Sequence, residues 1–154
     1  RGSTARDLSG TPEGVAASPF MWNAGAAEHF RATACEALLW VPAPRLIVTR
    51  VKGHASLECL LFYTRRAERE MQLGKLTVFH DWTGMDSYEP AARDELKRWG
   101  KARNGDFESV DYLVHSKVIA MLVSVAALTL GRELHATTDR AFFLDKLDVA
   151  LASR

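Results

Sequence analysis

The fold is indicated most clearly by residues 46–54, which read Leu46-Ile47-Val48-Thr49-Arg50-Val51-Lys52-Gly53-His54. This run is rich in β-branched residues and stops at a glycine and a histidine, which is typical of a buried β-strand. From Ser56 to Leu73, apolar residues then recur at helical spacing with charged residues between them. A strand followed by a helix of this length predicts that the next strand runs parallel to the first.

The same alternation continues toward the C-terminus. Further strands are predicted at 76–80, 109–114 and 134–137, and they show almost no polar alternation, as expected when both faces of a sheet are covered. The helices between and after them begin at capping residues and stop at Asn104-Gly105 or at Gly131. Their predicted caps are Asp86 or Ser87, then Ser116, then Asp139.

The N-terminal part is less regular. Residues 1–25 are rich in small residues and proline without a clear period, so they are predicted to form an irregular arm that precedes one domain over 26–154. Residues 28–40 fit either a helix or strands. Pro42 and Pro44 then predict a turn and a β-hairpin with the strand at 46–51. The predicted fold is α/β, with a single sheet of four to five mostly parallel strands, an N-terminal hairpin and four helices.

Composition excludes several classes of protein. The 154 residues are 47% hydrophobic and 25% charged, which is typical of one globular domain, and the net charge of +1 argues against nucleic acid as a partner. The longest apolar stretch, residues 118–130, is too short for a transmembrane helix. Two cysteines without a CxxC pair, Cys35 and Cys59, favour a reduced cytoplasmic setting, although they leave a single bridge open.

Three predicted strands end at a histidine, namely His54, His80 and His115. In a parallel sheet these residues lie at the edge where α/β folds bind ligands. A metal-dependent or hydrolytic enzyme is therefore one alternative, and it requires the three side chains to converge. Neither HExxH nor CxxC spacing supports a metal, and Ser116 lacks the GxSxG pattern of a nucleophile elbow. No metal or other cofactor is expected.

Three short motifs carry a family resemblance. They are Val51-Lys52-Gly53, Phe79-His80-Asp81-Trp82-Thr83-Gly84 and Asp139-Arg140-Ala141-Phe142. With the order of elements, they resemble the STAS domain (sulfate transporter and anti-sigma factor antagonist), and within it the SpoIIAA-like proteins of bacteria, over residues 36–151. The resemblance implies a non-enzymatic regulatory or scaffold module that binds another protein.

The resemblance also implies a phosphorylation site. Anti-sigma factor antagonists of this family carry an Asp-Ser pair at the start of the second helix, where a partner kinase phosphorylates the serine. The matching pair here is Asp86-Ser87. A phosphate there meets the free N–H groups of a helix N-terminus and adds negative charge to a docking surface. The alternative is that Asp86 or Ser87 is an ordinary N-cap.

Two segments are predicted to form contact surfaces. The first is a loop after the second core strand, with an aromatic residue that is unexpected in a loop unless it serves recognition. Its binding residues are Asp81, Trp82, Thr83, Met85, Asp86, Ser87 and Tyr88. The second is the helix over 117–130, which is apolar on nearly every face. It predicts a homodimer or partner interface, a site covered by the N-terminal arm, or a pocket for a small apolar ligand or lipid.

Overall fold

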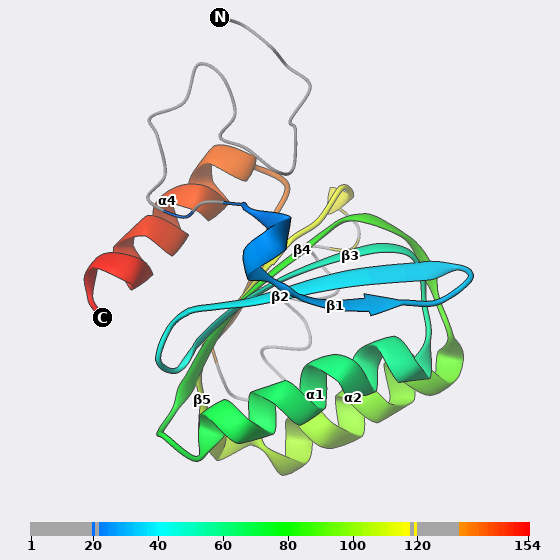
Figure 1. Cartoon of the computed structure of the whole chain (residues 1–154), viewed down its shortest axis with the longest axis horizontal. Coiled ribbons are helices and arrows are strands. Elements are labelled where there is room, and N and C mark those ends of the chain that lie inside the picture. The colour runs from blue at the N-terminus through cyan, green and yellow to red at the C-terminus, as the bar shows by residue number, and fades with distance from the viewer. Residues whose placement is uncertain (1–19, 21, 118, 120–132) are drawn as a thin grey trace, which may run out of the picture.

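The computed structural model describes residues 20, 22–117, 119 and 133–154, which form one six-stranded sheet with helices on both faces (Figure 1). The strands lie in the sheet in the order in which they occur in the chain. The first two pairings are antiparallel and the other three are parallel, so the sheet is mixed. The strands are β1 (Glu28–Arg31), β2 (Cys35–Ala43), β3 (Leu46–Ala55), β4 (Leu76–Tyr88), β5 (Phe107–Leu113) and β6 (Leu134–Thr137).

Three α-helices are described. They are α1 (Leu57–Met71), α2 (Pro90–Ala102) and α4 (Arg140–Ala152), with 3-10 turns η1 (Ala24–Ala26) and η2 (Asn104–Asp106). Ser56 caps α1 and Asp139 caps α4, each by accepting a backbone N–H from the first turn. The helix predicted over 117–130 lies outside the described residues, except for Lys117 and Ile119.

The prediction of four to five strands is corrected to six. The ambiguous segment at 28–40 contributes the short β1 and most of β2, which pair with each other and extend the predicted hairpin. The hairpin turns at Pro44 and Arg45, while Pro42 lies inside β2. A register shift between Trp40 and Ala43 accommodates this proline, which lacks the N–H for a regular ladder bond.

Strand β4 is much longer than predicted. The segment 81–88, predicted to be a loop, continues the strand as far as Tyr88. The long β3 explains this, because it provides pairing partners for β4 up to Ala55. Consequently neither Asp86 nor Ser87 caps α2. The N-cap residue is Glu89, whose side chain makes no capping bond to its own helix.

Two buried layers hold the sheet in place. Helices α1 and α2 cover one face, and α4 covers the other (Figure 1). The first layer includes Ile47, Val78 and Trp99. The second includes Trp40, Phe79 and Phe143, together with Phe20 and Trp22, which precede β1 and pack edge-to-face. Phe20 and Trp22 therefore belong to the packed domain.

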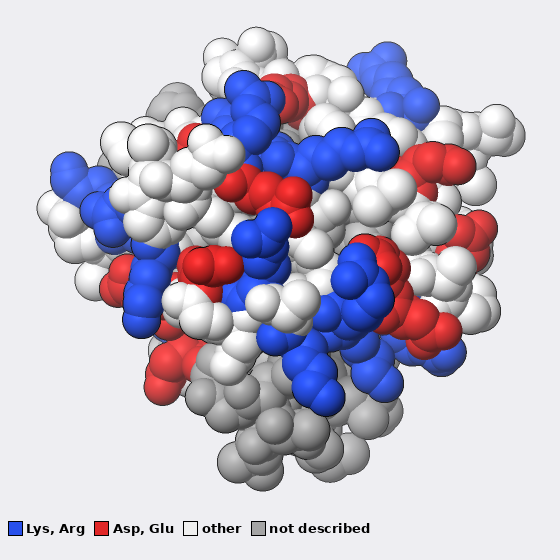
Figure 2. All heavy atoms as spheres, turned by 90° about the horizontal axis from the view of Figure 1, so that it is seen from below, with Lys and Arg blue, Asp and Glu red and all other residues white. Residues whose placement is uncertain are grey.

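Charges of both signs alternate over the face that carries α1 and α2, and Figure 2 shows no large region of one sign there. This distribution agrees with the net charge of +1. Within the described part of the chain, no helix combines the length and the hydropathy that crossing a membrane would need.

Candidate functional site

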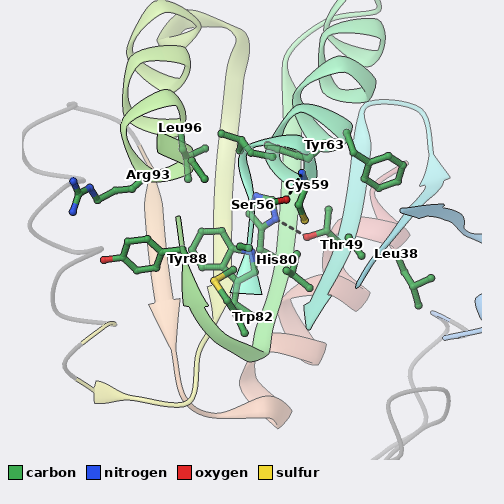
Figure 3. A pocket seen from close by; sticks show the side chains of 17 residues that line it. Leu38, Thr49, Ser56, Cys59, Tyr63, His80, Trp82, Tyr88, Arg93 and Leu96 are labelled. Carbon is green, nitrogen blue, oxygen red and sulfur yellow. Dashed lines mark hydrogen bonds between the residues drawn. The ribbon is translucent and has the colours of Figure 1, made fainter. Parts of the chain in front are cut away.

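A cavity of about 160 Å³ lies between the sheet and helices α1 and α2, beside the C-terminal half of β4 (Figure 3). Its wall is formed mainly by apolar and aromatic side chains from two helices and three strands. The lining residues are Ala37, Leu38, Thr49, Val51, Ala55, Ser56, Cys59, Leu60, Phe62, Tyr63, His80, Trp82, Met85, Tyr88, Ala92, Arg93 and Leu96. Concave apolar sites with few polar groups are the usual form of small-molecule pockets.

The irregular pairing of β4 decides which of its side chains face the cavity. His80 and Trp82 are two residues apart and share a face, as alternation in a strand requires. Beyond Asp81 the register with β3 shifts twice, and each time β4 contains one residue more than β3. These bulges change the phase of the alternation, so the next cavity residues are Met85 and Tyr88.

The two helices contribute residues at i and i+4 spacing. Cys59 and Tyr63 lie on one face of α1, and Ala92 and Leu96 lie on one face of α2. In each pair the residue nearer the N-terminus of the helix is small. The cavity is therefore lined by a small side chain in the first turn of each helix.

His80 is the buried polar group at the centre of this site. Its Nδ1 shares a hydrogen bond of 2.6 Å with the Oγ1 of Thr49, its neighbour on β3. Its ring stacks on Tyr112 and meets the edge of Tyr63. Burial lowers the pKa of His80 to about 3, so the imidazole is neutral near pH 7. A group with so low a pKa is a weak general base.

Two buried thiols lie at the β2 side of the cavity. Cys35 and Cys59 belong to one packed cluster with Ala37 and Val51, and both are free cysteines. Burial, and then the hydrogen bond and charge of Cys35, raise the pKa of the Cys59 thiol well above its ordinary value. The protonated thiol thus adds another weakly polar, uncharged group to the wall.

The rim of the cavity is formed where β4 ends and α2 begins. Tyr88 is 48% exposed, and Arg93 follows in the first turns of the helix. A hydrogen bond from Arg93 to Asp94, and then one involving Tyr88, raise the pKa of the guanidinium. Figure 3 shows the polar ends of Tyr88 and Arg93 extending to the same side.

The other face of β4 carries a buried ionic cluster. Asp81 is fully buried, and its Oδ2 lies 3.3 Å from Nη1 of Arg140 and 4.0 Å from Nε of Arg50. Its Oδ1 accepts hydrogen bonds from the backbone N–H and the hydroxyl of Thr83. The guanidinium of Arg50 lies over the ring of Trp22. This cluster joins β3, β4, α4 and the segment before β1.

The three strand-end histidines have different surroundings. His80 is in the core, whereas the Nδ1 of His54 bonds the Oγ of Ser87 at 2.7 Å, and His115 is exposed after β5. Among the described residues, no group of three or more His, Cys, Asp or Glu side chains is arranged to hold a metal ion. The enzymatic alternative requires the three histidine side chains to converge, and the structure does not bring them together.

The predicted contact segment 81–88 divides between the two faces of the sheet. Trp82, Met85 and Tyr88 line the cavity, whereas Asp81 and Thr83 belong to the ionic cluster. Asp86 and Ser87 are exposed.

Sequence reasoning missed the helical half of the wall. It placed Ala92 and Leu96 on an apolar helix face and did not single out Cys59 or Tyr63. The detectable signal was a polar residue directly after an apolar run in each of two strands, namely Thr49 after 46–48 and His80 after 78–79.

Comparison with known proteins gives a match at the level of the fold. An uncharacterised protein of the DUF3478 family from Shewanella loihica PV-4, described as having a SpoIIAA-like fold, aligns with a TM-score of 0.58 and 16% identity. The alignment covers 79% of this chain and 92% of that protein. The fold is SpoIIAA-like. No family model matches the sequence, and no curated protein matches it. The SpoIIAA-like fold therefore describes the architecture, and function is argued from the site.

Proposed function

We propose that this protein is a binding module that holds a small apolar molecule in the cavity between the sheet and helices α1 and α2. The observation that carries the proposal is the cavity itself, about 160 Å³ in volume and walled mainly by apolar side chains. An apolar cavity of about 150 Å³ is large enough to hold benzene. The ligand size favoured by this volume is therefore about one aromatic ring.

The polar groups of the wall favour binding over catalysis. His80 shares its Nδ1 with Thr49, and its low pKa disfavours proton abstraction near neutral pH. The raised pKa of Cys59 disfavours the thiolate that a nucleophile requires. Neutral, partnered polar groups in an apolar wall orient a ligand at little cost in desolvation.

The test measures binding of benzene, toluene and indole to the full chain by ligand-observed NMR and calorimetry. In the Ala92→Phe variant, the added ring occupies the cavity, so we expect binding to be lost. Ala91→Phe is the matched control, because Ala91 is the exposed neighbour on α2 and does not line the cavity. Ala92→Leu is a milder filling variant if the phenylalanine variant does not fold. Failure of all three probes to bind would contradict the proposal.

A protein contact through the end of β4 is the second candidate. Pairing of β4 with β5 stops at Asp81, after which β3 is the only strand among the described residues that pairs with β4. Tyr88 at its end is exposed. A strand with an open edge and an exposed aromatic residue favours addition of a partner segment. Phosphorylation of Ser87 remains a prediction for this same surface. The homodimer predicted from sequence involves the helix over 117–130, and a second copy of the chain that adds to the β4 edge is a further way to form a dimer.

Self-association tests this second candidate first. Analytical ultracentrifugation of the full chain should show a dimer that Tyr88→Ser weakens. Phe142→Ser is the control, because Phe142 is an equally exposed aromatic residue on α4. A chain that stays monomeric at every concentration would argue against the homodimer.

A further inference from the structure

The rim of the cavity contains a charge that the proposed function leaves unused. Among the described residues that line the cavity, Arg93 is the only one with a charged side chain, because His80 is neutral, and none of them carries a carboxylate. An apolar cavity whose single rim charge is positive is complementary to a ligand with an apolar body and one negative group.

The Arg93 side chain is placed so that it can reach such a group. It is 51% exposed, and its Nε donates to Asp94 Oδ1 at 3.2 Å, in a surface pair between chain neighbours. Exposed ion pairs of this kind contribute little to stability. Arg93 can therefore leave Asp94 and bind the carboxylate of a ligand at little cost in the free energy of folding. A guanidinium also offers a planar pair of donors that matches a carboxylate.

Glu89, the other acidic residue at the start of α2, does not compete with a ligand for Arg93. Glu89 lies one residue beyond Tyr88, but its Oε1 accepts a hydrogen bond from the backbone N–H of Leu57 at 3.0 Å. Its charge is thereby directed to the start of α1. The first turn of α2, which carries Arg93, is left without a side-chain cap. The positive N-terminal end of α2 favours a negative group at this rim.

We propose that the ligand of this cavity is a compact aromatic carboxylate, with its ring between α1, α2 and β4 and its carboxylate at Arg93 and the Tyr88 hydroxyl. This inference rests on the proposed function, because it assigns a ligand class to the same cavity. The cavity volume limits the apolar part to about one ring. The carboxylate remains at the rim, where it keeps part of its hydration.

The experiment compares phenylacetate, phenylacetamide and phenethylamine, which have similar shapes and carry negative, zero and positive charge at neutral pH. We expect phenylacetate to bind about fivefold more tightly than the amide, the scale of an exposed charge pair, and the amine to bind most weakly. Arg93→Gln should reduce phenylacetate binding to the level of the amide and leave amide binding unchanged. Arg98→Gln is the control, because Arg98 is exposed on the same helix outside the lining.

The outcomes separate the two proposals. Equal binding of phenylacetate and phenylacetamide, or a preference that survives in Arg93→Gln, would overturn the aromatic carboxylate and leave the apolar binding site standing. Binding of none of the three compounds, together with no binding of benzene, toluene or indole, would overturn the proposed function as well. A preference that weakens as salt concentration rises would support the ionic contact.

Discussion

The backbone N–H of Leu57 donates a hydrogen bond to the Oε1 of Glu89, so the N-cap residue of helix α2 serves the first turn of helix α1. The backbone N–H of Glu89 in turn donates to the carbonyl of Ala55, just before α1. The two helices that cover the cavity therefore share one anchoring residue at the end where the cavity opens.

This relationship predicts the effect of removing the Glu89 side chain. Glu89→Ala should lower the free energy of unfolding by about 1 kcal/mol, because a first-turn N–H of α1 loses its acceptor. Glu89→Gln keeps an acceptor and should lose less. Chemical denaturation measures both variants. Asp94→Ala, which removes an exposed carboxylate of α2, is the control and should show almost no change.

His80 predicts an acid dependence of stability. The unfolded chain binds a proton on this histidine below its ordinary pKa of 6.5, whereas the folded chain does not until about pH 3. Stability is therefore complete above pH 6.5 and falls as the pH is lowered, by about 2 kcal/mol at pH 5. Denaturation curves of the wild type and His80→Gln between pH 7 and 5 measure this loss. An equal pH dependence in both proteins would contradict the assignment to His80.

Asp81 predicts a large loss of stability. This fully buried carboxylate lies between Arg50 and Arg140, so Asp81→Ala leaves buried positive charge without its partner. We expect the free energy of unfolding to fall by about 3 kcal/mol or more. Asp94→Ala removes an exposed carboxylate that also pairs with an arginine, and it should have little effect. Thermal and urea denaturation of the two variants give the comparison.

Two glycines provide a matched pair for the backbone. Gly53 has φ of +87°, and a Cβ there would lie 2.2 Å from the carbonyl oxygen of Ala34. Gly53→Ala should therefore destabilise the protein by more than about 1 kcal/mol. A Cβ on Gly105 would meet nothing within 4 Å, so Gly105→Ala should be neutral or stabilising. Similar midpoints of unfolding for both variants would contradict this account.

The regular core of the fold could be predicted from sequence because its signals are local. The β-branched run of β3, the start of α1 near Ser56, the capping residue Asp139, and the strand at 134–137 all agree with the structure. The SpoIIAA-like resemblance agrees at the level of the fold.

The failures of sequence reasoning concern pairing between distant segments. No local sequence signal indicates that β4 continues past His80, because the extension depends on pairing with the far end of β3. The cavity was missed for the same reason. It depends on Ala92 and Cys59 lining one cavity from separate helices, and each position taken alone fits an ordinary core face.

The order of the strands in the sheet has a consequence for biosynthesis. Every strand after β1 lies beside the strand that precedes it in the chain. When a new strand is synthesised, its pairing partner has therefore already emerged from the ribosome. The sheet can thus grow from β1 toward β6 as translation proceeds, without waiting for a later segment to insert between earlier ones. Short separations between paired strands also keep the entropy of loop closure low.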